Sequence, residues 1–196
     1  MPRVSQEQTD HNRIAIEEAS SRLFRERGLH GVSVAEVMAR AGLTHGGFYG
    51  HFSSKDGLAA VACSKAVADS GERWSRRFAA LPDAASRRAA YVQGYLAPAT
   101  RDRAGTACAI AALAGDVARE PADKPVRAAY LDGVKSMAAR LAQLQLPDNA
   151  EPVDQAALAD LATLVGALVL ARATRGDPLS DDILASARAR LLKAAP

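Results

Sequence analysis

The sequence predicts an all-helical protein with a small N-terminal domain and a larger C-terminal domain. Apolar residues make up 48% of the chain, but aromatic residues only 5%. Apolar and small residues recur at helical spacing, whereas few segments show the alternation of a strand. Turn residues separate about nine such segments, and 196 residues leave room for a small domain joined to a medium one.

The first predicted element is a helix over residues 11–27, which ends at Gly28 and Gly31. Small and apolar residues recur in it at positions i, i+3, i+4, i+7 and i+8, the pattern of one buried helix face. These residues are Ile16, Ala19, Ser20, Leu23 and Phe24.

A second, shorter helix is predicted from Ser33 to Gly42. Ser33 and Glu36 have the spacing of a capping box, in which each side chain accepts a hydrogen bond from the other residue's backbone N–H. Gly42 tolerates a positive φ and closes the helix. Its inward face comprises Val34, Val37, Met38 and Ala41.

Residues 42–52, GLTHGGFYGHF, predict a third helix that begins at Thr44 and ends near Phe52. On a helical wheel Phe48 and Phe52 share one face, while the opposite face carries Gly46, Gly47 and Gly50. Each glycine costs about 1 kcal/mol of helix propensity relative to alanine. We therefore expect the two phenylalanines to anchor this helix to its neighbours.

A helical face without side chains lets a bulky partner approach the backbone. Two short helices joined by a tight turn after a longer helix describe a helix-turn-helix, whose second short helix enters the DNA major groove. The groups around the glycines suit this role, because hydroxyls, imidazoles and amines can bind phosphate oxygens. They are Thr44, Tyr49, His51 and Lys55.

Two other kinds of site fit this segment less well. His45 and His51 are six residues apart, whereas two metal ligands on one helix face are usually four apart, so we predict no metal site. A phosphate-binding loop needs GxxxxGK[ST] after a strand, and neither is present. Net charge gives no support for DNA binding, because residues 1–60 contain seven Lys and Arg and seven Asp and Glu.

Ser53 or Ser54 caps a fourth helix that reaches about residue 81, with Asp56 favourable in its first turn. Five more helices are predicted near 84–100, 106–119, 123–145, 153–174 and 180–193, with loops such as LPDNAE between them. The most apolar run, residues 161–171, is about half the length of a membrane span, which favours a core or interface helix. No signal peptide is recognisable, and Cys63 and Cys108 are too few for a disulfide framework, so we expect a cytoplasmic protein without a membrane segment.

Residues 19–58, ASSRLFRERGLHGVSVAEVMARAGLTHGGFYGHFSSKDGL, resemble the DNA-binding domain of the TetR (tetracycline repressor) family of transcriptional regulators. Gly47 and Gly50 stand where this family often has larger side chains. Direct base readout then rests on Thr44 and His45, and DNA shape contributes more. The DNA contacts expected from the pattern and the resemblance are Ser33, Thr44, His45, Gly46, Gly47, Tyr49, Gly50, His51 and Lys55.

The resemblance implies a helix-turn-helix domain at residues 1–53 and a ligand-binding and dimerisation domain at residues 54–196, linked by the helix near 54–81. For the effector pocket we expect Trp74, Phe78, Tyr91, Tyr95, Cys108, Leu113 and Tyr130. For the homodimer interface we expect Leu161, Leu164, Val165, Leu168, Ile183, Leu184, Ala187 and Leu191. Packing within one subunit is the alternative for both sets.

The sequence therefore predicts a homodimeric regulator, most simply a repressor that an unknown small molecule releases from a palindromic double-stranded DNA operator. The predicted lever is the helix near 54–81, and no cofactor is expected. As an alternative, Cys108 near a helix N-terminus predicts a redox or electrophile sensor. Asp116 can serve a cationic ligand or be solvated. No paired carboxylate or nucleophile–base set is recognisable, so we do not expect an enzyme.

Overall fold

The computed structural model describes residues 6–144 and 155–193 and is built of helices over these ranges, as the sequence predicts. The predicted loop at residues 146–151 lies outside them. In chain order the α-helices are α1 Gln6–Arg27, α2 Val34–Arg40, α3 Lys55–Phe78, α4 Ala84–Tyr95, α5 Pro98–Asp102, α6 Ala109–Arg119, α7 Pro125–Gln143, α8 Gln155–Ala173 and α9 Leu179–Lys193. Two 3₁₀ helices are interspersed, η1 His45–Gly50 and η2 Ala104–Thr106.

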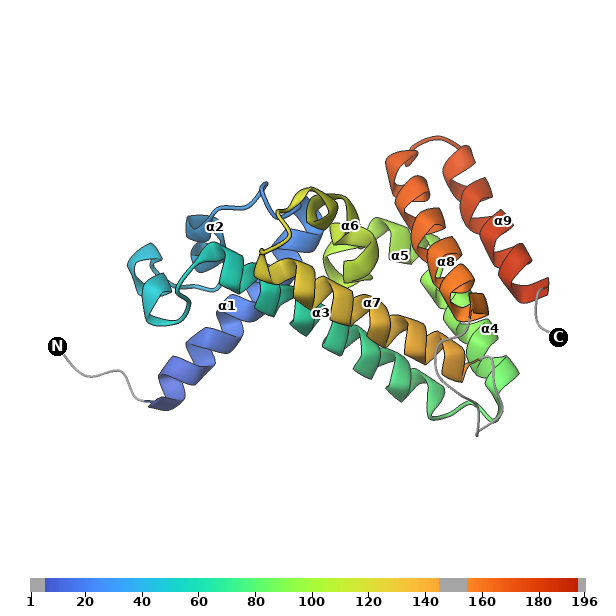
Figure 1. The fold of residues 1–196 in the computed structure, drawn as a ribbon, viewed down its shortest axis with the longest axis horizontal. Helices are drawn as coiled ribbons and strands as arrows, with labels where there is room; N and C mark the ends of the chain where they lie inside the picture. Colours follow the sequence, from blue (N-terminus) through green and yellow to red (C-terminus); the bar gives the residue numbers. More distant parts are fainter. Residues whose placement is uncertain (1–5, 145–154, 194–196) are drawn as a thin grey trace.

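The molecule is elongated, with α1, α2 and η1 at one end and α8 and α9 at the other (Figure 1). Helices α3 and α7 pack against each other along the length between these ends. Gly133 of α7 allows this close packing, because a Cβ there would lie 2.8 Å from Cγ2 of Val67 on α3. The α3–α7 pair thus connects the helix-turn-helix end with the rest of the protein.

Helices α1 and α2 and the start of α3 match the predicted signals closely. α1 begins earlier than predicted, at Gln6, but its predicted apolar face is buried. Ser33 and Glu36 form the complete capping box, and Gly42 has a φ of +74° after α2. The choice left open for α3 is settled, because the Ser54 hydroxyl accepts a 3.0 Å hydrogen bond from the N–H of Gly57.

Three predicted boundaries were wrong. The helix predicted at 84–100 is two helices, since Pro98 has no N–H to continue α4 and instead begins α5. α3 ends at Phe78 rather than near residue 81. The helix predicted from residue 106 begins at Ala109, after the 3₁₀ turn of η2.

The apolar side chains form two cores. One lies between α1, α2, η1 and the start of α3, and it also receives Leu113 and Val117 from α6. The other lies between α4, α6, α7, α8 and α9. A nearly buried ion pair supports the second core: Arg88 of α4 contacts Asp160 of α8 at 2.6 Å and donates to the carbonyl of Leu191 on α9 at 3.0 Å.

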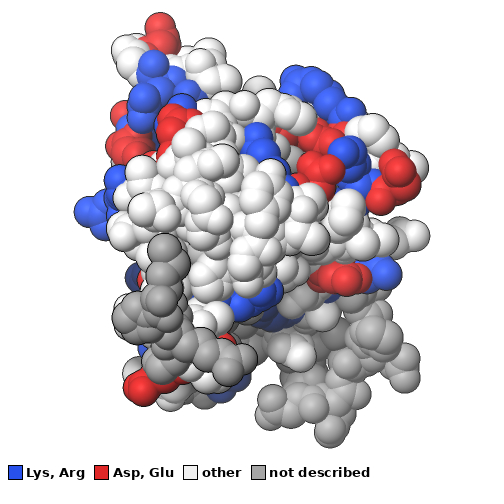
Figure 2. Space-filling model, turned by 90° about the vertical axis from the view of Figure 1, so that its left-hand side faces the viewer, with Lys and Arg blue, Asp and Glu red and all other residues white. Residues whose placement is uncertain are grey.

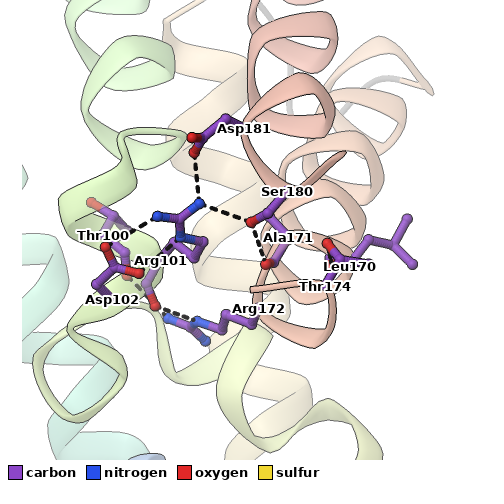
Figure 3. A network of polar contacts seen from close by, with 9 residues as sticks. All are labelled: Thr100, Arg101, Asp102, Leu170, Ala171, Arg172, Thr174, Ser180 and Asp181. Atoms are coloured by element: carbon purple, nitrogen blue, oxygen red, sulfur yellow. Dashed lines mark hydrogen bonds and ion pairs between the residues drawn. The ribbon is translucent and has the colours of Figure 1, made fainter. Parts of the chain in front are cut away.

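The turn between α8 and α9 is fixed to α5 by arginines (Figure 3). Arg101 of α5 donates to Ser180 and Asp181 at 2.8 and 2.6 Å. In the opposite direction, Arg172 of α8 donates to the carbonyl oxygens of Thr100 and Arg101, both at 3.3 Å. These charge-assisted bonds hold α5 in place beside the end of α4.

Helix α8 is apolar on two faces. One face is buried inside the subunit and includes Leu164 and Leu168, both fully buried. The other is exposed or half-buried and follows the i, i+4, i+7, i+11 spacing of a helical stripe, with Leu158, Ala162, Val165 and Val169. As a result, α8 is long and apolar enough to cross a membrane by length and composition alone, although the run at residues 161–171 suggested otherwise.

Candidate functional site

The glycine-rich segment forms a 3₁₀ helix, η1, rather than the predicted α-helix. The N–H of Gly47 bonds to the carbonyl of Thr44 at 3.1 Å, an i→i−3 bond. The N–H of Phe52 then bonds to the carbonyl of Phe48 at 3.0 Å, which is α-helical spacing and brings the two rings onto one side. Three glycines within six residues explain the tighter turn, because they stabilise the α-helix poorly.

Phe48 and Phe52 anchor η1 as predicted. Phe48 is fully buried, Phe52 is 6% exposed, and their rings stack with centroids 6.0 Å apart. The guanidinium of Arg13 on α1 covers the Phe52 ring at 4.4 Å and donates to the carbonyl of His51 at 2.6 Å. The sequence reasoning missed Arg13, since no local pattern reports a contact across 38 residues.

The glycines of η1 face open space. A Cβ built at Gly46 or Gly50 would meet nothing within 4 Å, and one at Gly47 would make only an ordinary 3.7 Å contact with Met38. Thr44 and His45 are exposed beside them, and Tyr49 is 71% exposed. Figure 2 looks onto this end of the molecule and shows a broad uncharged area with Lys, Arg, Asp and Glu around it.

The other predicted DNA contacts are less available to DNA, because they are half-buried or already hydrogen-bonded within the protein. The Ser33 hydroxyl already donates to Oε2 of Glu36 at 2.8 Å, so its one donor is used within the capping box. Hydrogen bonds from the Ser33 N–H and hydroxyl, with help from Arg27, lower the pKa of Glu36 to about 2. His51 and Lys55 are half-buried at the edge of the glycine face.

Helix α6 is connected to this end of the molecule by polar contacts. Asp116 of α6 stabilises the turn between α1 and α2, because its Oδ2 accepts a 2.9 Å hydrogen bond from the N–H of Leu29. Arg25 of α1 is buried and donates to the carbonyl of Ala107, just before α6, at 2.9 Å. Beyond α6, Glu120 pairs with His30 at 2.7 Å.

Comparison with known proteins identifies the helix-turn-helix. Residues 16–62 match the model of the bacterial regulatory proteins, tetR family. The chain therefore contains a TetR-family helix-turn-helix domain, which extends from α1 to the start of α3. A domain of this kind is that of a transcriptional regulator. No curated protein gives a significant match to the sequence.

Solved structures resemble the chain over nearly its full length. A regulator from Cytophaga hutchinsonii is 19% identical with a TM-score of 0.78, covering 99% of this chain and 98% of that one. NemR from E. coli, in its reduced form, is 23% identical with a TM-score of 0.77, covering 94% and 98%. A regulator from Agrobacterium tumefaciens is 21% identical with a TM-score of 0.76, covering 96% and 100%. At these identities the likeness establishes the fold.

The C-terminal part of the chain contains two cavities that share Trp74. The larger has a volume of about 400 Å³, and an aromatic cluster lines it. The Trp74 ring lies 5.6 Å from Phe78 and 4.7 Å from Tyr91, measured between centroids. Arg87 and Arg140 also line this cavity, and sequence reasoning did not find them.

The smaller cavity has a volume of about 190 Å³. Tyr95 and Cys108, both predicted as pocket residues, line it together with Trp74. Two other predicted pocket residues line neither cavity: Leu113 is buried against the helix-turn-helix core, and Tyr130 donates to the carbonyl of Ile110 at 3.0 Å. Asp116, considered for a cationic ligand, holds Leu29 instead.

Most of the residues predicted for a dimer interface pack within the subunit. Five are buried there: Leu164, Leu168, Leu184, Ala187 and Leu191. They hold α8 against α9 and the second core, which was the alternative explanation for their pattern. Leu161, Val165 and Ile183 are half-buried. The sequence could not separate the two faces of α8 because both are apolar.

Proposed function

We propose that this TetR-family regulator is a homodimeric repressor that a small-molecule effector releases from a near-palindromic DNA operator. The observation that carries the proposal is the open glycine face of η1, held in place by Phe48 and Phe52. A surface without side chains lets the backbone of η1 approach the floor of the major groove. Tyr49 and Lys55 lie at its edge, where they can bind phosphate oxygens.

The two subunits would place their η1 segments in successive major grooves of the same operator. This requires a separation of about 34–36 Å between them, or one more helical turn for a longer spacer. With no base-reading side chain at Gly46, Gly47 and Gly50, sequence selection rests on Thr44, His45 and the deformability of the DNA. We keep the division proposed from the sequence, with DNA binding in residues 1–53 and the remainder serving the effector and the dimer.

For the dimer interface we propose the outward stripe of α8, composed of Leu158, Ala162, Val165 and Val169. Its support is that Leu158 is 47% and Val169 38% exposed in the subunit, on a helix that is already packed on a neighbouring face. A large exposed apolar stripe of this kind is normally covered by another surface. A second copy of α8 across a two-fold axis would cover it in a cytoplasmic protein.

The effector site that we propose comprises the two cavities around Trp74. The path from there to DNA runs through α6, which the sequence reasoning did not anticipate. Residues 106–108 border the smaller cavity, and Arg25 holds the carbonyl of Ala107. A ligand that displaces this segment would shift α1 and thereby η1. Coupling of this kind is reciprocal, so DNA would weaken effector binding by the same factor.

The test is operator binding by the purified protein. DNA fragments recovered by selection from a random library should share an inverted repeat, and the dimer should shift such a fragment in gel electrophoresis. A matched fragment with one half-site scrambled should bind at least tenfold more weakly, because each half-site contributes its own contacts. Selection of a single, non-repeated site would contradict the two-fold arrangement.

A second candidate function uses Cys108 as an electrophile or oxidant sensor. The observation that favours it is the position of Cys108 as the N-cap residue of α6 and in the wall of the smaller cavity. The NemR structure is described as a reduced form, which points to a redox state of that protein. Under this hypothesis Cys108→Ser would abolish the response to oxidants but leave operator binding intact, whereas a reversible effector would still act on the variant.

A further inference from the structure

The smaller cavity is lined by cations and hydroxyls without a facing acid. Arg73 and Arg77, one turn apart on α3, are both exposed and line the cavity. Among the residues that the structure describes, none that lines this cavity is Asp or Glu. Because a protein normally places carboxylates beside its arginines, two guanidinium groups in an acid-free wall indicate a site for an anion.

The contacts that both arginines make with described residues use only part of each guanidinium. Arg73 donates through Nη2 to the carbonyl of Thr106 at 3.1 Å, and Arg77 lies over the Trp74 ring at 5.4 Å. A guanidinium has five N–H groups arranged as a planar fork, so each can add a bond to a carboxylate. Arg25 lies behind Arg73, and burial together with the charge of Arg73 lowers its pKa to about 10. The carboxylates of Asp69 and Glu26 face Arg25 but do not line the cavity.

An unpartnered donor lies in the wall of the same cavity. The Tyr95 side chain is 2% exposed, and its hydroxyl has no hydrogen-bond partner among the residues that the structure describes. Burial above all, and then the neighbouring Cys108 thiol, raise the pKa of Tyr95 well above its usual value. The hydroxyl therefore remains protonated and can donate to a ligand oxygen. Leaving such a group without a partner is costly, and a bound acceptor would remove that cost.

Trp74 connects this polar cavity with the larger aromatic one, because its ring lines both. A ligand with an acidic group and an apolar body could place the acidic group in the smaller cavity and the apolar body in the larger one. We propose that the smaller cavity is the carboxylate subsite for an organic acid, with the carboxylate between Arg73, Arg77 and the Tyr95 hydroxyl and the apolar body against Trp74 and Phe78. This inference rests on the proposed function, since it names the chemical class of the effector.

The site also offers a route to the DNA-binding end. A carboxylate bound in the cavity would draw the guanidinium of Arg73 toward it and so weaken the bond from Arg73 to the carbonyl of Thr106, its present acceptor. The neighbouring carbonyl, of Ala107, is the one that Arg25 of α1 holds. Binding of the acid would therefore weaken the contact of residues 106–107 with α3. The same two residues are held to α1 by the hydrogen bond from Arg25 to Ala107.

The experiment measures binding of acids and of their uncharged amides to the full-length protein. Trp74 is the sole tryptophan in the sequence, so its fluorescence reports on both cavities. The probes are hexanoate, benzoate and phenylacetate, each paired with its amide. We expect at least one acid to give a saturable change, and its amide to bind about tenfold or more weakly, as is typical when a charge-assisted bond is lost.

Three variants and a matched control locate the subsite. Arg73→Gln and Arg77→Gln should each weaken binding of the acid about tenfold and leave the amide unaffected. Tyr95→Phe should weaken binding of the acid about fivefold without lowering Tm, because the hydroxyl that it removes bonds to none of the described residues. Arg76→Gln is the control, since Arg76 neighbours Arg77 on α3 but lines neither cavity.

The proposal is overturned if no acid binds, if the amides bind as well as the acids, or if Arg76→Gln loses as much affinity as Arg77→Gln. Its failure can be told apart from failure of the proposed function. Neutral compounds that release the operator while no acid binds would refute the carboxylate subsite and leave the repressor intact. Acids that bind at Trp74 without releasing the operator would support the subsite and refute its role in induction.

Discussion

At the scale of single residues, a substitution at Gly46 should affect stability and operator binding differently. A Cβ at this position would meet nothing within 4 Å, and alanine is a better helix former than glycine. Gly46→Ala should therefore leave Tm unchanged or raise it, yet weaken operator binding about tenfold, or about 1.4 kcal/mol, because the methyl group stands between η1 and the groove. Thermal unfolding and gel-shift titration measure the two effects.

Gly115→Ala is the matched control, because Gly115 is an exposed glycine of α6 whose added Cβ would make only ordinary contacts. It should raise Tm slightly, because alanine favours the α-helix, and it should leave operator affinity unchanged. If Gly46→Ala bound the operator as tightly as the native protein, the glycine face would have no role in groove entry. Gly42→Ala differs from both, since its φ of +74° makes any side chain strained and should lower Tm.

Tyr49 and Lys55 should affect DNA binding in different ways. Tyr49→Phe removes a neutral donor, so affinity should fall for all DNA sequences together while its dependence on salt stays the same. Lys55→Ala removes a cation, and the slope of log affinity against log salt should become shallower by about one. Fluorescence anisotropy across a salt series separates them. An unchanged slope for Lys55→Ala would show that this amine does not contact phosphate.

At the scale of elements, the capping box of α2 makes stability depend on pH. Hydrogen bonds from Ser33 lower the pKa of Glu36 from 4.5 to about 2. The stabilisation is therefore complete above pH 4.5 and is lost as the pH falls from there toward 2. Glu36→Gln cannot titrate, so its Tm should fall less than that of the native protein over this range. Glu72→Gln, an exposed change on α3, is the control and should follow the native curve.

Helix α6 should transmit effector binding, because Asp116 accepts from Leu29 in the turn after α1. Asp116→Ala should keep operator binding within a few-fold but reduce the factor by which an effector weakens it, ordinarily about 5–150-fold. Asp123→Ala, an exposed acid in the α6–α7 connection, should retain the full factor. Equal coupling in both variants would exclude this contact from the path.

The sequence predicted elements well where the deciding interactions are local. The Ser33–Glu36 box, the positive φ of Gly42 and the Phe48–Phe52 pair depend on residues at most four apart. Prediction failed where contacts between residues far apart in the sequence determine the structure. Examples are the Arg13–His51 hydrogen bond and the cavity wall that contains Arg73 and Arg77 but no described carboxylate. The two apolar faces of α8 are a related case, because composition cannot tell which one the subunit buries.

At the scale of the whole molecule, the outward face of α8 governs assembly. Val169→Glu or Leu158→Glu places a charge on a surface that is exposed in the subunit, so folding should persist while the dimer dissociates, since a buried unpaired charge is costly. Operator affinity should then fall about 100-fold or more, because a monomer binds one half-site without the gain from the second. Light scattering gives the mass, and gel-shift titration gives the affinity.

Two comparisons make this prediction specific. Leu131→Glu changes a leucine of α7 that is 51% exposed, and it should leave both mass and affinity as in the native protein. Leu164→Ala instead removes a fully buried side chain from the inner face of α8, which should cost about 2–5 kcal/mol of stability. A native dimer mass for both Val169→Glu and Leu158→Glu would move the interface elsewhere on the molecule. A monomer that kept full operator affinity would instead refute two-fold recognition of the DNA.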